Sequence, residues 1–600
     1  MPSRLVHIPA SSLHEPSLVL KESILKSEIP SYATLSYCWG PPSDTKRQLR
    51  TTSHRLKEFL TAIPVALMPP IMRDVVDVCR SLSIRHIWID ALCILQDDVR
   101  DWEIESAEMG EIYRHSLLTI CTPSSASCLQ GILGTRDNNN IRLNFKSAVH
   151  PHIMGNLVLQ SIEPEASTHR SFAHQHPYLQ MESSTWATRG WTFQERYLAQ
   201  RILYFDRRMI SFECGNGLQA ENGFSRDGNP LESAETIEQF TRGHVTKHVL
   251  YQMWRESIIR EHFKRQFTVI EDRLPSLSGL ANTILKFTKD TFCAGFWKGD
   301  ITYSLLWGLS PPENHRISLS ELLSSFETSS FIAPSWSVYS RQGAWISWVV
   351  GGFGPGTDWH ITAEYDNLST NLVAEGKNQL GRLRNDSMLK ISARRFALGS
   401  AHGMMLDQIE SEPQPLFHIK SQALNSRIAE CRLDFDPLSS TEHSDLDSLS
   451  LVLIASSCGS TDLAGSKRGP DLEAETPQSG CETCQICAKC EGCVWKKGYQ
   501  SEAWQGLATL DGYEFATVML ANDGGCGRLH EPCSYCFHCQ ACHYGSNVSA
   551  RHAWGLVIVP ARSLGESVFR RVGVFTSRDD GKAGGVRLFE GKNLEQLSLA

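Results

Sequence analysis

Long hydrophobic runs are absent from this sequence. The longest apolar stretches, of which Ala344–Phe353 is one, are much shorter than the about 20 apolar residues that a membrane-spanning helix needs. The first residues, Met1–Pro9, lack the continuous apolar core of a signal peptide. We therefore expect a cytoplasmic protein that has no membrane partner.

An excess of basic residues is also absent. The 600 residues include 58 lysines and arginines against 66 aspartates and glutamates, which gives a net charge of −8. Nucleic-acid-binding domains carry a basic stripe or patch, so we expect no nucleic-acid partner. Hydrophobic residues make up 41% and charged residues 21% of the chain, as is usual in soluble globular proteins. At roughly 150 residues per domain, the length predicts about three or four domains.

Cysteine, in contrast, is plentiful, and the nineteen cysteines fall into two kinds. Ten crowd into two clusters between residues 481 and 542. The other nine stand alone, mostly beside apolar residues, and in a reducing compartment such residues are buried free thiols. These are Cys38, Cys79, Cys93, Cys121, Cys128, Cys214, Cys293, Cys431 and Cys458.

The first part of the chain alternates between strand-like and helix-like patterns. Three short apolar runs are typical of buried strands, at residues 33–37, 86–90 and 117–121. Between them, Pro69-Pro70 opens a helix with one continuous apolar face, and Asp101 is suited to cap a second helix. Strand, helix, strand, helix, strand is the order of a parallel α/β sheet.

The rest of the chain changes character more than once. Residues 134–185 are predicted to be loop-like, and residues 235–290 have a helical pattern with a break near 272–281. From about residue 330 short β-type runs alternate with polar loops, and residues 459–480 read as a flexible linker. The predicted organisation is an α/β domain at 1–215 with its motif core at 32–196, a helical connecting region at 216–330, and a β-rich C-terminal region at 331–600 with a Cys-rich insertion at 481–545.

Three segments each run from apolar or aromatic residues into a cluster of polar ones. They read Tyr32-Ala-Thr-Leu-Ser-Tyr-Cys-Trp-Gly40, Ile87-Trp-Ile-Asp-Ala-Leu-Cys-Ile-Leu-Gln-Asp-Asp98 and Arg189-Gly-Trp-Thr-Phe-Gln-Glu195. Together with the stretch from Asp101 to Tyr113, and in this order, they resemble the fungal heterokaryon incompatibility (HET) domain. Outside the domain, further segments are similar to those of its large single-chain members, at Asp272–Ala281, Leu306-Trp307, Ala333–Ser337 and Phe569–Phe575.

The resemblance implies a protein that recognises non-self and triggers programmed cell death in fungi, with a protein partner or self-association. It also implies a distant similarity to TIR domains, α/β signalling modules with a flavodoxin-like parallel sheet, some of which cleave NAD. Leu35-Ser-Tyr37 stands where a TIR domain has its first strand. Trp191-Thr-Phe-Gln-Glu195 has the Trp-to-Glu spacing of enzymatic TIR domains, with Thr192 where a cysteine is common.

Glu195 is the candidate catalytic residue, with NAD as the candidate substrate. Cleavage of the nicotinamide–ribose bond develops positive charge on the ribose, which a nearby carboxylate stabilises, as in glycoside hydrolysis. Trp191, one turn away, is suited to stack on a flat ring, and Arg189 to pair with a phosphate. The alternative is structural: Glu195 pairs with Arg189, Arg196 or Arg201, and Trp191 fills the core.

Asp90 ends a predicted strand at the edge where open α/β sheets bind ligands. With Asp97 and Asp98 it could hold a ribose hydroxyl or a divalent cation. Equally, Asp97, Asp98 and Asp101 are suited to cap helices and loops. Ser36 and Trp39 are candidates for the same ligand-binding edge, although Trp39 could instead plug the core.

The Cys-rich insertion repeats the Cys-x2-Cys spacing, in which one turn presents two thiolates to a zinc ion. Cys484 and Cys487 with Cys533 and Cys536 would make one tetrahedral site, although adjacent pairs would serve as well. An iron–sulfur cluster and an unstructured insertion are the alternatives, and neither run has the Cys-Pro ending of ferredoxins. We expect structural zinc that joins two loops.

Two functional hypotheses therefore remain open. In the first, the α/β domain self-associates and binds a nucleotide, and it hydrolyses NAD. In the second, it is a non-enzymatic scaffold that oligomerises while the β-rich region recognises a partner. A zinc-dependent nucleic-acid binder fits less well, because residues 481–543 carry few basic residues.

Overall fold

The structure is a computed structural model, and the secondary structure is described for residues 1–24, 30–134, 140–150, 152–160, 184–206, 209–221, 223–227, 232–310, 317–342, 345–349, 361–399, 404–408, 416–421, 426–437, 448–457, 552–577 and 584–600. The chain divides into two compact units. The first contains Met1–Asp300, Ser329–Gly343 and Leu372–Ser387. The second contains Ile301–Thr328, Ala344–Asn371 and Met388–Ala600.

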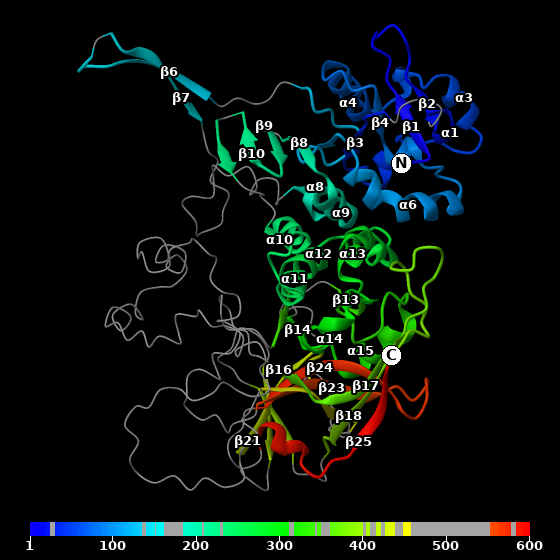
Figure 1. Cartoon of the computed structure of the whole chain (residues 1–600), viewed down its shortest axis with the longest axis vertical. Coiled ribbons are helices and arrows are strands. Elements are labelled where there is room, and N and C mark those ends of the chain that lie inside the picture. Colours follow the sequence, from blue (N-terminus) through cyan, green and yellow to red (C-terminus); the bar gives the residue numbers. More distant parts are fainter. Residues whose placement is uncertain are drawn as a thin grey trace. The chain divides into compact units, whose positions relative to one another are not determined.

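A nine-stranded mixed sheet forms the centre of the first unit (Figure 1). Its four parallel strands lie in the order β8-β5-β3-β4. They are β3 (Ala33–Ser36), β4 (His86–Trp88), β5 (Leu118–Cys121) and β8 (Arg201–Phe205). Every residue of β3 and of β5 is buried, as expected for parallel strands that are covered on both faces. The predicted parallel α/β arrangement is therefore confirmed for these four strands, within a sheet that is mixed as a whole.

Antiparallel strands extend this sheet at both edges. On one side lie β1 (Arg4–His7) and β2 (Ser17–Leu20). On the other lie β9 (Ile210–Cys214), β10 (Gly217–Ala220) and β11 (Ser225–Asp227). The whole sheet is mixed, with its parallel strands in the middle.

Two helices connect the parallel strands. Helix α4 (Pro70–Ser81) starts at Pro70, as predicted, and buries Ile71, Val75 and Cys79. Helix α6 (Val99–Arg114) starts earlier than predicted, because the Asp98 side chain accepts from the backbone N–H groups of Arg100 and Asp101. The prediction that Asp101 caps this helix is therefore wrong.

Shorter helices lie between these elements. They are α1 (Lys21–Ile24), α2 (Pro42–Thr45), α3 (Leu56–Thr61), α5 (Asp90–Cys93), α8 (Thr185–Thr188) and α9 (Gly190–Leu198). A hairpin of β6 (Asn140–Lys146) and β7 (Met154–Gln160) occupies part of the stretch predicted to be loop-like. The apolar alternation of Ile141, Leu143 and Phe145 has the period of two that marks a strand.

The helical region belongs to the first unit. It contains α10 (Glu232–Thr241), α11 (Lys247–Met253), a π-helical turn (Trp254–Ile259), α12 (Arg260–Phe263) and α13 (Pro275–Thr288). The predicted break near 272–281 is misplaced, because Pro275 begins α13 rather than interrupting it. Proline is favoured in the first turn of a helix, where its missing N–H has no partner to lose.

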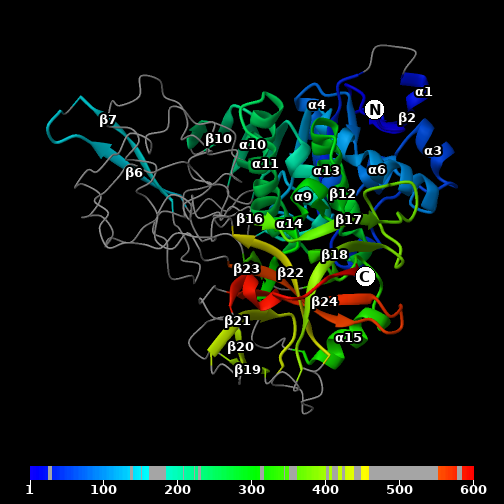
Figure 2. The same ribbon diagram turned by 60° about the horizontal axis from the view of Figure 1, so that its bottom comes forward.

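The second unit is β-rich, as predicted, and is built on a ten-stranded sheet (Figure 2). The strands are β16 (Ile361–Ala363), β17 (Tyr365–Asn371), β18 (Met388–Ala397), β19 (Met404–Gln408), β20 (Phe417–Ser421), β21 (Ser426–Leu433), β22 (Ser450–Ser457), β23 (Ala553–Pro560), β24 (Val568–Ser577) and β25 (Leu594–Leu599). Pairings of β18 with β22, β22 with β23, β23 with β24, β24 with β25 and β25 with β18 form a closed circuit.

Smaller elements complete this unit, namely α14 (Ile301–Ser304), β14 (Trp307–Ser310), α15 (Leu319–Thr328) and β15 (Trp345–Trp348). A buried ion pair lies within its core. The Arg571 guanidinium donates to the Asp434 carboxylate over 2.7 Å, and neither side chain is exposed. It also donates to the backbone oxygen of Trp307 and lies over the ring of that residue, 3.4 Å from the centroid. Two segments picked out by the family resemblance thus meet in the core of this unit.

Candidate functional site

The carboxyl ends of the parallel strands gather several polar side chains. The chain leaves β3 for β4 on one side and then crosses back to β5 on the other side of β3. Such a reversal is a topological switch point, where open α/β sheets bind ligands outside the carboxyl ends of the strands. Ser36 ends β3 and Cys121 ends β5, and these two residues are register partners. The order of the strands within the sheet therefore places Ser36 at this switch point.

Ser36 and Glu195 are in direct contact at this edge. The Ser36 hydroxyl donates a hydrogen bond to the Glu195 carboxylate and accepts one from the Trp186 indole over 2.7 Å. Ser36 is fully buried and Glu195 is 8% exposed. The two predicted site residues are thus brought together in a closed, water-poor setting.

Local structure around Trp186 and Thr192 holds Glu195 in place. Ser184 caps the single turn of α8, and Trp186 packs edge-on against Tyr204 of β8 at 6.1 Å. The Thr192 hydroxyl, in the first turn of α9, donates to the backbone oxygen of Trp186 over 2.6 Å. The threonine of the Arg-Gly-Trp-Thr-Phe-Gln-Glu segment therefore links α8 to α9.

Burial raises the pKa of Glu195 to about 7. The hydrogen bond from Ser36 lowers this pKa, the negative charge of Asp90 raises it, and Arg189 and Tyr113 lower it again. Desolvation is the largest of these effects because the charged form loses its hydration. Glu195 therefore changes its charge near neutral pH, which is the behaviour expected of a functional carboxyl group.

Asp90 is held next to the same cluster. Its carboxylate accepts from the Trp39 indole over 3.0 Å and from the backbone N–H of Ala91 over 2.7 Å. Burial raises the pKa of Asp90, while the Ala91 N–H, Arg189, Trp39 and Tyr37 lower it. Trp39 thus lies beside Asp90 and is joined to it by a hydrogen bond, while its ligand-binding role stays a prediction.

Arg189 supplies the positive charge of this cluster. It occupies the N-cap position of α9 and is half-buried. Its charge lowers the pKa of Glu195, of Asp90 and of Cys38. Ser36, Trp39, Asp90, Arg189 and Glu195 therefore form one electrostatically coupled group.

The motif segments that build this group also identify their family. Residues 32–195 match the family model described as heterokaryon incompatibility protein (HET). This segment is a HET domain. It implies, in broad terms, a function of the heterokaryon incompatibility type. Searches of curated proteins and of solved structures found no match to the chain.

Trp191 of the HET domain makes its contacts away from Ser36. Its ring packs edge-on against Trp102 of α6 at 6.4 Å, and its indole N–H donates to Asp272 over 3.2 Å. Asp272 also pairs with Arg382 over 2.7 Å, and the Arg382 guanidinium lies over Trp102. These contacts match the structural alternative for Trp191, in which its side chain packs between helices instead of binding a ligand.

Gln194 of the HET domain has a structural role as well. Its side-chain oxygen accepts from the backbone N–H of Gly279 over 2.7 Å. Gly279 of α13 and Gly110 of α6 approach so closely that a Cβ on Gly110 would lie 2.8 Å from the Cα of Gly279. The three helices α6, α9 and α13 therefore meet at a point where two glycines are required.

The acidic residues after Asp90 are loop and cap residues. Asp97 accepts from the backbone N–H of Ser53 over 2.8 Å, and Asp98 caps α6. Asp101 pairs with Arg4 and accepts from the backbone N–H of Leu95 over 2.7 Å. The suggestion that Asp90, Asp97 and Asp98 hold a cation is not supported, because the described residues contain no group of three metal-binding side chains.

The zinc site predicted at Cys484, Cys487, Cys533 and Cys536 lies outside the described residues, as does the linker at 459–480. Eight of the isolated cysteines are free, and all of these except the half-buried Cys214 are buried, as predicted; Cys458 lies outside the described residues. In the described part of the chain no helix has the length and apolar character needed to cross a bilayer.

Three residues of the site were missed by sequence reasoning. Trp186, Tyr37 and Tyr113 surround the Ser36–Glu195 contact or influence the pKa of its neighbours. Tyr37 and Tyr113 stand inside the motif segments, so their hydroxyl groups could have identified them as site residues. Trp186 follows a long stretch predicted to be loop-like, and no periodicity marks it.

Proposed function

We propose that the HET domain is the effector of an incompatibility response and cleaves the nicotinamide–ribose bond of NAD with Glu195. The hydrogen-bonded contact between Ser36 and Glu195 at the switch point of the sheet carries this proposal. The order β4-β3-β5-β8 corresponds to 2-1-3-4, the strand order of flavodoxin-like sheets, which supports a TIR-like fold for the domain.

In the proposed reaction the C1′–N bond breaks and water adds at C1′. The bonding electrons leave with neutral nicotinamide, and the water loses one proton to solvent. The ionised Glu195 carboxylate stabilises the positive charge that develops on the ribose. The Arg189 guanidinium is placed to pair with a phosphate oxygen, and Asp90 to accept from a ribose hydroxyl.

Access to Glu195 requires a rearrangement, because the residue is only 8% exposed and its carboxylate already accepts from Ser36. We propose that self-association, or binding of a protein partner, opens this edge in the cytoplasm. NAD cleavage would then depend on assembly, and the protein would stay inactive as an isolated chain.

Nicotinamide release from NAD by the full-length protein, over a range of protein concentrations, tests the proposal. Glu195→Gln keeps the shape and the acceptor oxygen and removes the negative charge, so turnover should fall at least about a hundredfold. Glu111→Gln is the matched control, since Glu111 lies on the solvent side of α6 and pairs with Lys286. Equal turnover in wild type and Glu195→Gln would exclude the assignment.

The closed state of Glu195 favours a second function, that of a non-enzymatic scaffold. In that case the Ser36–Glu195 contact only stabilises the domain, and assembly alone signals. Cell death in a fungal host should then persist in Glu195→Gln and be lost when an exposed charge is reversed, as in Arg73→Glu on α4. The reverse pattern would favour the enzyme.

A further inference from the structure

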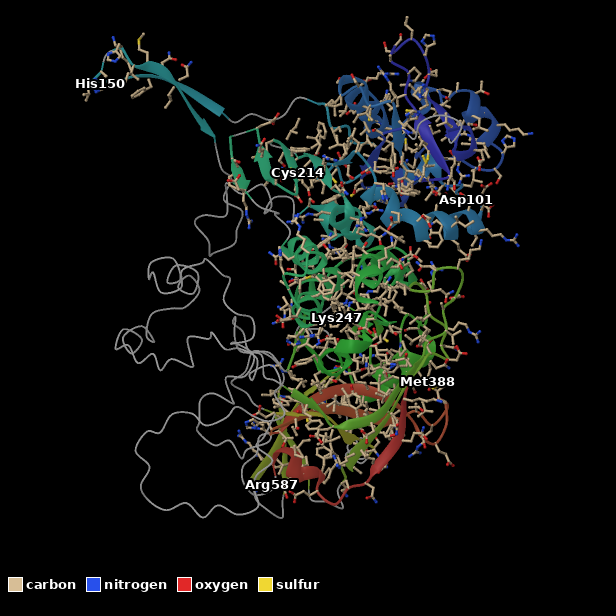
Figure 3. All side chains as sticks on the ribbon, viewed as in Figure 1. Asp101, His150, Cys214, Lys247, Met388 and Arg587 are labelled. Atoms are coloured by element: carbon tan, nitrogen blue, oxygen red, sulfur yellow. The ribbon has the colours of Figure 1, made fainter. Side chains whose placement is uncertain are left out.

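A cavity of about 580 Å³ lies in the first unit and shares no lining residue with the Ser36–Glu195 cluster. It is formed by the C-terminal ends of α6 and α9, the start of β8, the end of β9, and parts of α10 and α13. Its volume falls in the range of small-molecule sites, which is about 300–1,000 Å³. Cys214, labelled in Figure 3, marks its position on β9.

Two arginines line this cavity. Arg114 is the last residue of α6 and Arg201 the first of β8. Within the described part of the chain, no hydrogen bond or ion pair engages the Arg201 guanidinium. The positive charge of Arg114 interacts with the negative charge of Glu111 and lowers the pKa of that carboxyl group. One carboxylate, that of Glu213, also lines the cavity, but it accepts from the Tyr204 hydroxyl over 3.0 Å.

Apolar side chains supply much of the remaining wall. Three different elements contribute them: α9 contributes Leu198, β8 contributes Ile202, and α13 contributes Leu280 and Phe287. Phe287 is 44% exposed, which leaves part of its surface without protein contacts. Because Leu198, Ile202 and Leu280 are already buried, the apolar body of a ligand would mainly cover Phe287, gaining about 25 cal/mol for each Å² removed from water.

We propose that this cavity binds a small amphipathic organic anion, with its acidic group between Arg114 and Arg201 and its apolar body against Phe287. Guanidinium groups pair with carboxylate, sulfonate and phosphate oxygens in the same planar geometry. The ligand contacts Leu198 at the end of α9, the helix that carries Glu195.

Two fluorescent probes test the site on the full-length protein. 8-Anilinonaphthalene-1-sulfonate has an aromatic body with one negative charge, and N-phenyl-1-naphthylamine has the same body without the charge. The double variant Arg114→Gln/Arg201→Gln should bind the sulfonate about tenfold more weakly and the neutral probe equally well. Arg100→Gln, at an exposed position in the first turn of α6, is the control and should change neither affinity.

A second variant tests the cavity itself. Gly215 lines the cavity and a Cβ added there meets no atom within 4 Å, so Gly215→Trp adds a bulky side chain at the cavity wall without a clash at its first atom. Both probes should lose binding in this variant, while the thermal unfolding midpoint stays near that of the wild type. Sulfonate binding that is unchanged in both variants would overturn the proposal, since the dye would then bind elsewhere on the chain.

Discussion

The Ser36 hydroxyl donates a hydrogen bond to the Glu195 carboxylate, although 159 residues separate the two along the chain. This contact joins the first and the last segment of the family match. The middle segment contributes Asp90, whose negative charge raises the pKa of Glu195. The three sequence motifs are therefore one structural unit, and a substitution in one motif should affect the residues of the other two.

The titration of Glu195 predicts a pH-dependent stability. The folded protein keeps the proton up to about pH 7, whereas the unfolded chain releases it near 4.5. The folded state therefore binds more protons between these values, and the free energy of unfolding falls as the pH rises through this window. This difference in pKa between the folded and the unfolded state changes the free energy of unfolding by on the order of 3 kcal/mol.

Urea unfolding of wild type and Glu195→Gln at pH 5 and pH 8 measures this effect. The variant cannot ionise at this position, so it should be relatively more stable at pH 8 than at pH 5. If wild type and Glu195→Gln differ in the free energy of unfolding by the same amount at both pH values, the raised pKa of Glu195 is contradicted.

The close approach of α6 and α13 predicts an unusual response to alanine. In an exposed helix Gly→Ala stabilises by about 1 kcal/mol. At Gly279, however, the new Cβ would lie 2.5 Å from the Gln194 side-chain oxygen and 2.9 Å from the Cα of Gly110. We expect Gly279→Ala to destabilise the protein by about 1–3 kcal/mol.

Thermal unfolding would detect this loss as a lower midpoint. Gly215→Ala serves as the control, because its Cβ would enter open space. An unchanged or higher midpoint for Gly279→Ala would mean that the helices can separate without cost.

The buried pair in the second unit predicts a large loss on removing one charge. Asp434→Asn keeps the size of the side chain but leaves the Arg571 guanidinium buried without its counter-charge. Such losses amount to about 3–5 kcal/mol. Glu595→Gln is the control, because its pair with Arg395 is exposed and worth less than about 1 kcal/mol.

Chemical denaturation, followed by a tryptophan signal in this unit, separates these two variants. Equal midpoints would show that water or a neighbouring group compensates Arg571.

Zinc in the Cys-rich insertion is predicted from sequence spacing. The purified full-length protein should contain at least one zinc per chain by elemental analysis. Replacing Cys484 and Cys487 by serine should lower that content by one ion, whereas Cys431→Ser, a buried isolated thiol, should not. Zinc-free protein, isolated without chelators, would leave the iron–sulfur and unstructured alternatives.

Much of the N-terminal fold could be predicted because its elements carry strong local signals. The strand β3 is an apolar run followed by Gly40, and helix α4 has one continuous apolar face that begins after Pro69-Pro70; both were placed within a residue or two. The β6–β7 hairpin was missed because Asn, Arg and Lys between its apolar residues gave it the composition of a loop.

The site was predictable only in part, for a different reason. Spacing places Trp191 and Glu195 one helical turn apart, which suggests one shared ligand. The packing of α6 and the position of Asp272 decide instead that Trp191 contacts Trp102. Such tertiary contacts leave no trace in the spacing of residues along one helix, so the ligand-binding role of Trp191 stays a prediction.

The contact between α6, α9 and α13 also limits the positions at which segments of this gene can be exchanged by recombination. The family match ends at residue 195, yet α9 is covered by a helix that begins at Pro275 and is joined to it through Gln194 and Gly279. A chimera that swaps only the matched segment between relatives would pair a new α9 with an old α13. Recombination that keeps the protein functional should therefore favour breakpoints beyond residue 288.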